Sequence, residues 1–374
     1  MRIALVTESV DRKTGIGRVV YELARQFVRR NHEVHLVAQT VAVNDHGSRV
    51  HQIRAASPWH SVNRFVMRYS VPRLLRELDS QVINSFLIGR GATVVTAQSC
   101  HAAGIALRSQ YKEIRPRGNR GIFDRVAIHD EKTLFNSPTT RRIIAVSQLV
   151  KKQICEYYNV DEAKVAVVPN GVDLQRFEEL QRSEKRDTWR RDLNLRDDER
   201  VLLFVGNEFA RKGLHVVIET IARLRNYPLR LVIVGGDNPV PFLRIAEALG
   251  ISKKLIFVGS VEVPEQYFAL ADVFVFPTFY EPFGLVIIEA MAAGVPVITS
   301  KHAGAVEGMR HGEEGLFLEN PSSVEELSTT LRRLLDDPQL SDMLVRKAFD
   351  KVRLFSWDQI AESTLNVYHT TIST

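Results

Sequence analysis

The chain has 374 residues, of which 45% are hydrophobic and 25% are charged, and its formal net charge is +6. This length favours two domains with a core each, and the composition is that of a globular protein rather than of a fibrous or disordered one. No apolar run reaches the roughly 18 residues that a membrane-spanning helix needs, so we expect no such helix.

Apolar runs of strand length alternate with helical patterns along the whole chain, which favours an α/β protein with two doubly wound parallel sheets. In the first part these runs are Ile3–Val6, Val34–Val37, Val82–Ile83, Val94–Thr96, Ile143–Val146 and Val165–Val168. In the second part they are Val201–Val205, Leu231–Val234, Leu255–Val258, Val273–Phe276, Val297–Ile298 and Leu316–Leu318.

The domain boundary is expected near the turn residues Asn170 and Gly171, which follow Pro169 and precede the polar stretch 181–200. We therefore expect an N-terminal domain over residues 1–168 and a C-terminal domain over 169–354. Residues 355–374 form a final segment.

The first strand is followed by Thr14 to Ala24, in which Gly15 and Gly17 could let the backbone approach a ligand. A dinucleotide fingerprint would place its glycines directly after the strand and an acid after strand two. Here the third small position is Val20 and strand two ends at Gln39. A NAD-dependent dehydrogenase is therefore disfavoured, although it stays an alternative.

Positive charge is concentrated in the N-terminal domain. Residues 1–168 hold 26 Lys and Arg against 14 Asp and Glu, a net charge of +12, whereas the remainder holds 24 and 30, a net charge of −6. Arginines alternate with apolar residues in 61–76 and 108–125, a pattern that suits an anionic membrane surface or a phosphorylated acceptor. A nucleic-acid-binding protein is a further alternative, but no nucleic-acid reader motif is present.

The sequence has no cysteine pairing pattern, no signal peptide and no Asp-X-Asp motif, and these features indicate the cellular compartment and the use of metal ions. Cys100 and Cys155 have no pairing pattern, and neither has another Cys or a His at metal-binding spacing, which is typical of the reducing cytoplasm. The first residues, MRIALVTES, lead directly into a strand, so we expect no signal peptide. No Asp-X-Asp motif occurs, and we expect no metal site of that kind and no cofactor.

The C-terminal domain carries two cations where its first strand ends. Arg211 and Lys212 stand in the loop Gly206 to Gly213, directly after the strand Val201–Val205. The departure of a diphosphate builds negative charge, and cations at the mouth of the sheet would stabilise it.

Residues 272–300 hold the strongest signal. The strand Val273–Phe276 ends at Pro277, and a helix is expected from about Gly284. The N–H groups of Phe283, Gly284 and Leu285 would then suit an anion or a hydroxyl group. The two carboxylates of this segment, Glu281 and Glu289, suit vicinal hydroxyls. Amides for phosphate and carboxylates for polyols together indicate a nucleotide sugar.

The block Glu281 to Glu289, E-P-F-G-L-V-I-I-E, resembles the E-x7-E signature of retaining glycosyltransferases of family 4, which have the GT-B fold. The segments I-I-A-V-S-Q-L-V and K-V-A-V-V-P-N-G-V-D-L-Q-R-F resemble the interdomain region of that family, and F-S-W-D-Q-I-A resembles its last helix, which crosses back to the N-terminal domain. The resemblance implies two Rossmann-like domains that face each other across a cleft.

The same resemblance implies roles for single residues. Arg211 and Lys212 bind the diphosphate, Glu289 binds the nucleotide ribose, and Glu281 holds sugar hydroxyls. Gly15 and Gly17 lie over the donor phosphates and the transferred sugar. The amides of Phe283, Gly284 and Leu285 bind the sugar or the phosphate.

The chain departs from the family pattern at two places. Many members have an Arg directly after the first glycine of the basic loop, where this chain has Asn207. Many also read T-x-H-D after the strand Val94–Thr96, where this chain has Gln98 and Ser99 and moves a histidine to His101. Gln98 and His101 are both candidates for the place of the usual histidine. For His101, a role in the pocket and a place in the core are equally good explanations.

The R-K-G form of the basic loop resembles that of lipopolysaccharide-core glucosyltransferases. It implies a retaining enzyme that transfers glucose from UDP-glucose to a glycan or glycolipid acceptor, with lipopolysaccharide core as one candidate. The missing Asp-X-Asp motif adds the expectation that the enzyme needs no metal ion. The basic N-terminal domain adds the expectation that the protein binds peripherally at the inner face of the cytoplasmic membrane. GDP-mannose and UDP-GlcNAc remain open as donors.

Overall fold

The computed structural model describes residues 1–12, 14–53, 70–86, 91–110, 121–181, 185–261 and 264–373. The chain forms two compact units, one of Met1–Gly171 with Trp357–Thr374 and one of Val172–Ser356. We expected domain boundaries after residues 168 and 354, and the units divide after Gly171 and Ser356.

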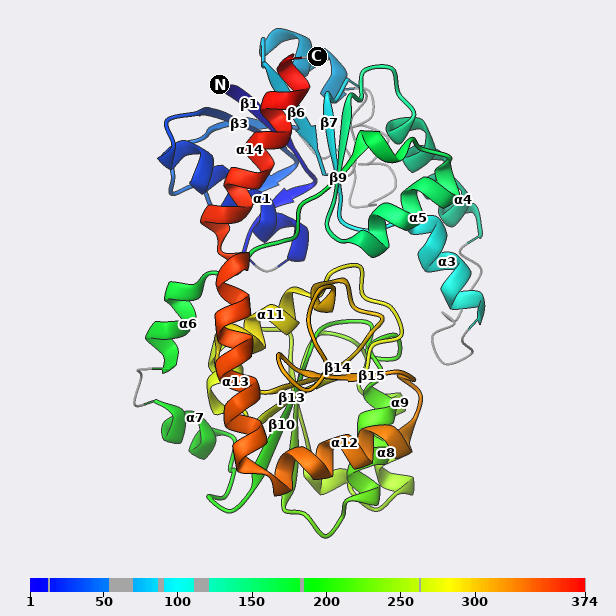
Figure 1. The fold of residues 1–374 in the computed structure, drawn as a ribbon, viewed down its shortest axis with the longest axis vertical. Helices are drawn as coiled ribbons and strands as arrows, with labels where there is room; N and C mark the ends of the chain where they lie inside the picture. Colours follow the sequence, from blue (N-terminus) through cyan, green and yellow to red (C-terminus); the bar gives the residue numbers. More distant parts are fainter. Residues whose placement is uncertain are drawn as a thin grey trace. The chain divides into compact units, whose positions relative to one another are not determined.

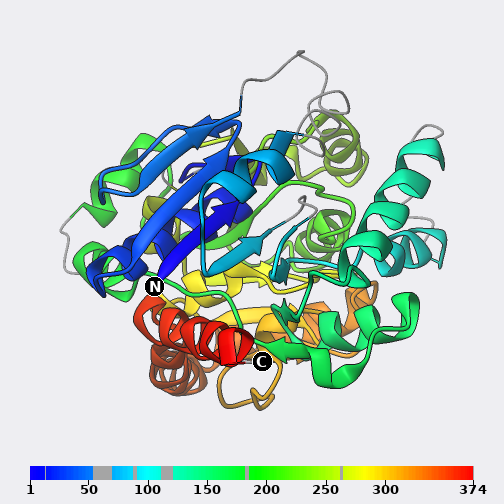
Figure 2. The same ribbon diagram turned by 90° about the horizontal axis from the view of Figure 1, so that it is seen from above.

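The N-terminal unit is built on a seven-stranded parallel sheet of spatial order β5-β3-β1-β6-β7-β8-β9 (Figure 1). Figure 2 shows blue and cyan arrows of this sheet from above. The strands of the unit are β1 (Arg2–Val6), β2 (Ser9–Val10), β3 (Glu33–Ala38), β4 (Thr40–Val41), β5 (Arg49–Gln52), β6 (Val82–Ser85), β7 (Val94–Ala97), β8 (Arg142–Ala145) and β9 (Val165–Val167). Its helices include α1 (Gly15–Arg29), α3 (His101–Gln110), α4 (Gly121–Phe135), α5 (Gln148–Tyr158) and α14 (Trp357–Ser373).

The central strand β1 shows why this sheet is apolar. All residues from Ile3 to Val6 are fully buried, and neighbouring side chains of a strand point to opposite faces of the sheet. Both faces are therefore covered, which a parallel sheet requires.

Helix α14 belongs to the N-terminal unit although it follows the C-terminal unit in the chain, and it lies beside α1 (Figure 1). Tyr368 is fully buried, and its hydroxyl accepts a hydrogen bond of 2.7 Å from the side-chain amide of Asn84 on β6. The side-chain oxygen of Asn84 in turn accepts a hydrogen bond of 2.9 Å from the hydroxyl group of Thr96 on β7. A buried polar chain thus fixes α14 to two strands.

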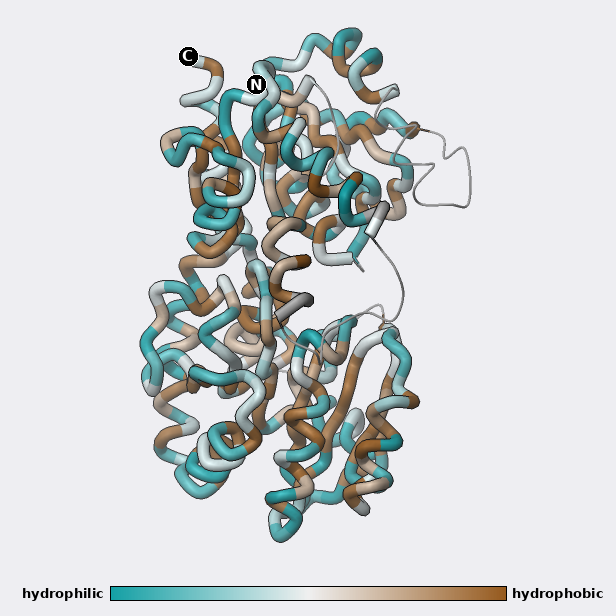
Figure 3. The backbone as a smooth tube through the Cα atoms, turned by 90° about the vertical axis from the view of Figure 1, so that its right-hand side faces the viewer, coloured by the Kyte–Doolittle hydropathy of each residue, from teal (hydrophilic) through white to brown (hydrophobic). Residues whose placement is uncertain are grey.

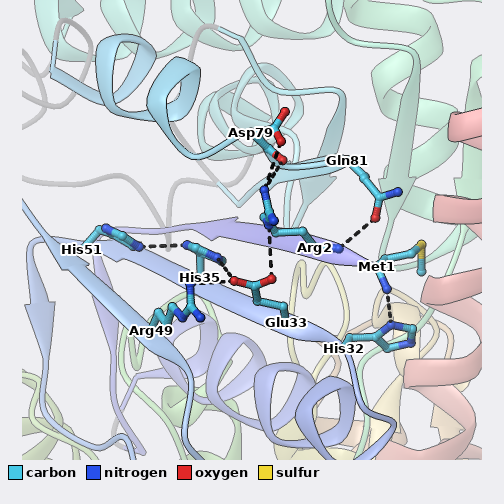
Figure 4. A network of polar contacts seen from close by, with 9 residues as sticks. All are labelled: Met1, Arg2, His32, Glu33, His35, Arg49, His51, Asp79 and Gln81. Carbon is cyan, nitrogen blue, oxygen red and sulfur yellow. Dashed lines mark hydrogen bonds and ion pairs between the residues drawn. The ribbon is translucent and has the colours of Figure 1, made fainter.

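A network of polar contacts joins β1, β3 and β5 (Figure 4). Glu33 contacts Arg2 at 3.2 Å and Arg49 at 2.7 Å. The ring nitrogens of His35 and His51 lie 2.9 Å apart, with the rings stacked at 5.0 Å. Arg2 and Glu33 begin their strands, and ligands of such sheets bind at the carboxyl ends, so we interpret the network as structural.

The C-terminal unit is built on a six-stranded parallel sheet of order β12-β11-β10-β13-β14-β15. Hydrophobic stretches of chain alternate with hydrophilic ones in both units (Figure 3). The strands are β10 (Arg200–Val205), β11 (Leu229–Val234), β12 (Leu255–Gly259), β13 (Val273–Phe276), β14 (Val297–Ser300) and β15 (Leu316–Leu318). The helices include α6 (Leu174–Gln181), α7 (Arg186–Asp192), α8 (Leu214–Arg223), α9 (Val240–Ala248), α10 (Glu265–Leu270), α11 (Leu285–Ala292), α12 (Val324–Asp336) and α13 (Pro338–Val352).

The chain order of this second sheet reverses between β10 and β13. These strands are parallel neighbours, with β11 and β12 on one side and β14 and β15 on the other. Doubly wound sheets bind ligands at such a switch point, outside the carboxyl ends of the strands. The loops that leave β10 and β13 carry the two motifs singled out in the sequence, so the fold brings those motifs together.

The expected fold class, two Rossmann-like parallel sheets with helices, is confirmed. Each apolar run corresponds to a strand whose ends agree within two residues. Three strands of the structure were not expected from the pattern, namely β2, β4 and β5. They are short or polar: β5 reads R-V-H-Q and has one buried neighbour strand, β3.

Candidate active site

The loop after β10 is anchored by a buried aromatic side chain. Phe209 is fully buried, and Glu208 before it has a positive φ of 58°. Helix α8 follows after Gly213, whose φ of 79° is left-handed. A Cβ atom on Gly213 would lie 2.2 Å from the carbonyl oxygen of Pro277. A glycine is therefore required where this loop meets the loop after β13.

The side chain of Lys212 lies in this contact between the loops. Its ammonium group stands 3.5 Å from Oε2 of Glu281 and 5.0 Å from the centre of the Phe276 ring. The side chain is only 12% exposed. Burial lowers the pKa of Lys212 below its usual 10.5, against the opposing attraction of Glu281.

Arg211 is the second cation of the site, and three groups fix it. Its Nη1 lies 3.6 Å from Oε2 of Glu281 and donates to the carbonyl oxygen of Tyr280, and its Nε donates to Glu208 at 2.8 Å. The backbone carbonyl of Arg211 accepts from the N–H of Phe279 at 2.9 Å. Burial opposes its charge, but Glu281 and Glu208 outweigh burial and raise the pKa of Arg211.

The start of α11 provides the amide groups that the sequence predicted. Gly284 precedes the helix with a left-handed φ of 106° and provides no side-chain cap. Among the described residues, none accepts a hydrogen bond from the N–H groups of Phe283, Gly284 and Leu285. The carbonyl of Phe283 accepts from Ala305 at 2.7 Å, which holds the turn in place. Three amides and two cations thus follow neighbouring strands of one sheet.

The two glutamates of the motif have different surroundings. Glu281 lies in the loop, where it contacts both cations. Glu289 lies in the second turn of α11 and is 3% exposed, so a ligand would reach it only at the buried face of the helix.

Asn207 contacts a loop that the sequence analysis did not single out. Its side-chain oxygen accepts a hydrogen bond of 2.8 Å from the N–H of Gly236, in the loop after β11. In the same loop a Cβ atom on Gly235 would lie 2.2 Å from the carbonyl oxygen of Gly206. The signal in the sequence is the pair Gly235-Gly236 directly after a strand.

The remaining predicted residues lie in the N-terminal unit. The side-chain amides of Gln98 and Asn170 form two hydrogen bonds with each other, at 2.9 and 3.2 Å. His101 begins α3, its ring Nε2 lies 3.2 Å from Asp124, and its backbone N–H donates to Glu131 at 2.9 Å. Its side chain is 34% exposed, so it is not a core residue.

The Gly-rich segment at the start of α1 is organised by an acid that sequence reasoning missed. Asp11 accepts from the N–H of Thr14 at 2.6 Å and from the hydroxyl of Ser9 at 2.6 Å. A Cβ atom on Gly17 would lie 2.5 Å from the Asp11 carboxylate, so Gly17 is explained by this internal contact. Gly15 is exposed at the first position of the helix.

The described part of the chain has neither a cluster of metal-ligating side chains nor a helix that could span a membrane. Within it, no three His, Cys, Asp or Glu side chains are grouped so that they could hold a metal ion. None of the helices described is both long and apolar enough to span a membrane.

Comparison with known proteins gives a family match in each part of the chain. Residues 13–176 match the family model described as Glycosyltransferase Family 4. Residues 185–351 match the model described as Glycosyl transferases group 1.

Curated relatives match over part of their length. The uncharacterized glycosyltransferase MJ1607 of Methanocaldococcus jannaschii is 33% identical over 66% of this chain and 64% of its own. A D-inositol 3-phosphate glycosyltransferase of Nocardioides sp. is 32% identical over 60% of this chain and 53% of its own. The lipopolysaccharide glucosyltransferase WaaG of Escherichia coli K12 is 29% identical over 56% and 57%. The chain thus spans between 53 and 64% of the length of these relatives.

Solved structures agree in fold over nearly the whole chain. The crystal structure of WaaG has a TM-score of 0.81 at 22% identity and covers 98% of this chain and 99% of its own. Anabaena Alr3699/HepE in complex with UDP-glucose has a TM-score of 0.75 at 17% identity and covers 99% and 100%. The two family models follow each other along the chain and together match most of it. The chain therefore joins a Glycosyltransferase Family 4 domain to a Glycosyl transferases group 1 domain in the GT-B fold, and it resembles the lipopolysaccharide-core glucosyltransferases.

Proposed function

We propose that the protein transfers a hexose from a nucleotide diphosphate sugar to a glycan or glycolipid acceptor, with retention at the anomeric carbon. The observation that carries this proposal is the contact of Lys212 and Arg211 with Glu281, two residues ahead of the open amides at the start of α11, at the switch point of the C-terminal sheet. Both cations are more than four-fifths buried, so a phosphate oxygen would meet them with little water between.

The chemistry follows from where charge develops. When the bond between the sugar and the diphosphate breaks, negative charge grows on the leaving phosphate, and fixed cations and amides stabilise that state more than the ground state. In a front-face transfer the leaving phosphate takes the proton of the acceptor hydroxyl, so no enzymic nucleophile is required. Glu281, beside both cations, is placed to accept hydrogen bonds from sugar hydroxyls.

For the donor we propose UDP-glucose. The R-K-G form of the basic loop, the match to a lipopolysaccharide glucosyltransferase and the likeness in fold to a protein solved with UDP-glucose support it. GDP-mannose and UDP-GlcNAc are the alternatives. A phosphorylated acceptor is compatible with the +12 charge of residues 1–168 and with a relative named for D-inositol 3-phosphate.

A screen for nucleotide release tests this function. The protein is incubated with UDP-glucose, UDP-GlcNAc and GDP-mannose, and free nucleotide diphosphate is measured. Lys212→Ala should lower the rate by roughly 10²-fold or more, because it removes a cation that faces the leaving group. Lys347→Ala is the matched control, because Lys347 also pairs with a glutamate, Glu313, but lies on α13.

Two results would contradict the proposal. Release from none of the three donors would reject the activity. A Lys212→Ala rate within twofold of wild type would remove Lys212 from the site.

We further propose that the protein works at the cytoplasmic face of a membrane, to which its basic N-terminal unit binds peripherally. The support is the excess of Lys and Arg in residues 1–168. Of the basic segments 61–76 and 108–125, residues 61–69 and 111–120 lie outside the described part of the chain. Arg73 is described, and its side chain is 84% exposed.

A further inference from the structure

We propose that Glu281 makes the site discriminate between a nucleotide diphosphate sugar and a bare nucleotide diphosphate, because its carboxylate competes with the diphosphate for the same two cations. This inference rests on the proposed function, since it concerns the same site. Besides holding the sugar, Glu281 then has a second role, which is to weaken the binding of the nucleotide product.

The geometry of the site provides the basis for this competition. A single carboxylate oxygen, Oε2 of Glu281, lies 3.5 Å from Nζ of Lys212 and 3.6 Å from Nη1 of Arg211. These are ion-pair distances, longer than hydrogen bonds. The same oxygen is buried and makes no hydrogen bond with a described residue. The two cations are therefore what stabilises its charge.

The two cations differ in the number of carboxylates at ion-pair distance from them. Within the part of the chain that the structure describes, Glu281 is the one carboxylate at ion-pair distance from Lys212. Arg211 has a second carboxylate, Glu208, whose side chain is 65% exposed and therefore well screened by water. A diphosphate that binds Lys212 must consequently replace Glu281 as the anion that pairs with its ammonium group.

The affinity for a ligand depends on whether that ligand donates hydrogen bonds to the Glu281 carboxylate in place of the lost cation contacts. A bound sugar presents hydroxyl groups, which can donate to the carboxylate and replace the lost cation contacts. A bare diphosphate has no such donor and adds negative charge beside an anion that is already buried, which is unfavourable. The product of transfer should for that reason bind less tightly than the donor.

The side chain of Glu281 can be changed without releasing its backbone. The N–H of Glu281 donates to the carbonyl of His302 at 3.0 Å, and its carbonyl accepts from Gly304 at 2.9 Å. These bonds hold the segment beside residue 303 whatever the side chain is. Replacement of the carboxylate therefore removes the competing charge and leaves the loop in place.

The experiment measures binding of UDP and of UDP-glucose by calorimetry, with GDP and GDP-mannose as a second pair. We expect Glu281→Gln to bind UDP about tenfold more tightly than wild type, the order of effect of one poorly screened charge pair. UDP-glucose should gain nothing or bind more weakly, so the preference for the sugar-bearing ligand should fall. Glu281→Asp, which keeps the charge but moves it away from the cations by one methylene, should tighten UDP binding by roughly threefold.

The matched control is Glu313→Gln, since Glu313 also contacts two cations, Arg310 and Lys347, but lies outside the loops of the site. It should change neither affinity. The inference is wrong if wild type binds UDP or GDP and Glu281→Gln binds the same nucleotide no more tightly. If Glu281→Gln does not fold, an affinity of Glu281→Asp equal to that of wild type refutes the inference in the same way. If wild type binds neither nucleotide, the proposed function fails instead.

Discussion

The space beside Gly206 lets Lys212 reach the centre of the site. Gly206 has a φ of +140°, and a Cβ atom there would lie 2.4 Å from Nζ of Lys212. We expect Gly206→Ala to displace the ammonium group and to lower the rate of nucleotide release by roughly 10²-fold, the effect of losing one fixed charge at the leaving group. Steady-state kinetics on the folded variant measure this.

A second glycine separates the loss of the cation from backbone strain. Gly250 also has a positive φ, +71°, but no atom lies within 4 Å of the Cβ position. Gly250→Ala should therefore cost about 1–2 kcal/mol of stability through the left-handed backbone alone and leave the kinetics intact. Equal activity of the two variants would show that the contact between residue 206 and Lys212 has no part in the reaction.

The charges of Arg211 and Lys212 also lead us to expect a reaction without a metal ion. Two largely buried cations and the amides at the start of α11 can stabilise the charge of a diphosphate that a metal ion would otherwise offset. Nucleotide release should proceed unchanged in excess EDTA. Complete loss with the chelator, restored by Mg²⁺ or Mn²⁺, would contradict the expectation.

At the level of elements, the docking of α14 depends on one buried hydroxyl. Tyr368→Phe removes the acceptor for the side-chain N–H of Asn84, which is fully buried on β6. An unpaired buried donor costs about 1–3 kcal/mol, so we expect the N-terminal unit to unfold at lower denaturant concentration. Hydrogen exchange of β6 resolves this unit from the other.

A tyrosine at the surface provides the comparison for Tyr368. The hydroxyl of Tyr227 contacts the carboxylate of Asp336 at 3.0 Å in an exposed position. Tyr227→Phe should change stability by less than about 0.5 kcal/mol, because water replaces the contact. If Tyr368→Phe has no larger effect than this, the polar chain to Asn84 does not hold α14.

Prediction from sequence succeeded for elements whose signal is local. The run Val273–Phe276 is a strand with those bounds, because both faces of a central parallel strand must be apolar. Strand β5 escaped prediction because an edge strand needs no apolar run, and its pairing with β3 is a contact distant in sequence. Local patterns thus indicate central strands better than edges.

The grouping of residues in the candidate site could be expected only in part, for the same reason. Arg211, Lys212 and Glu281 could be named because each follows a recognisable strand. That one oxygen of Glu281 contacts both cations depends on β10 and β13 being neighbours, which the sequence does not reveal. The role of Gly235 also remained hidden, since its partner Gly206 lies on another loop. The role of Asp11 depends on how the short turn before α1 folds.

For the whole molecule, the division of charge predicts a salt-dependent partner. Residues 1–168 carry a net charge of +12 and the remainder −6, so one end of the chain is attracted to anionic surfaces and the other is repelled. Each Lys or Arg near an anionic leaflet contributes about 1 kcal/mol, and this attraction decays over a Debye length of about 10 Å at 0.1 M salt.

Binding to vesicles should consequently fall steeply as salt rises, and neutral vesicles should bind poorly. Replacement of Arg115, Arg117, Arg120 and Arg125 by Gln should weaken binding to anionic vesicles and leave release of nucleotide from the donor intact, because Lys212 and Glu281 belong to the other unit. Sedimentation with vesicles of each composition at low and high salt measures this. Equal sedimentation with neutral and anionic vesicles, or none at low salt, would reject membrane attachment. The positive charge would then be assigned to a soluble anionic acceptor, whose phosphate the same arginines would bind.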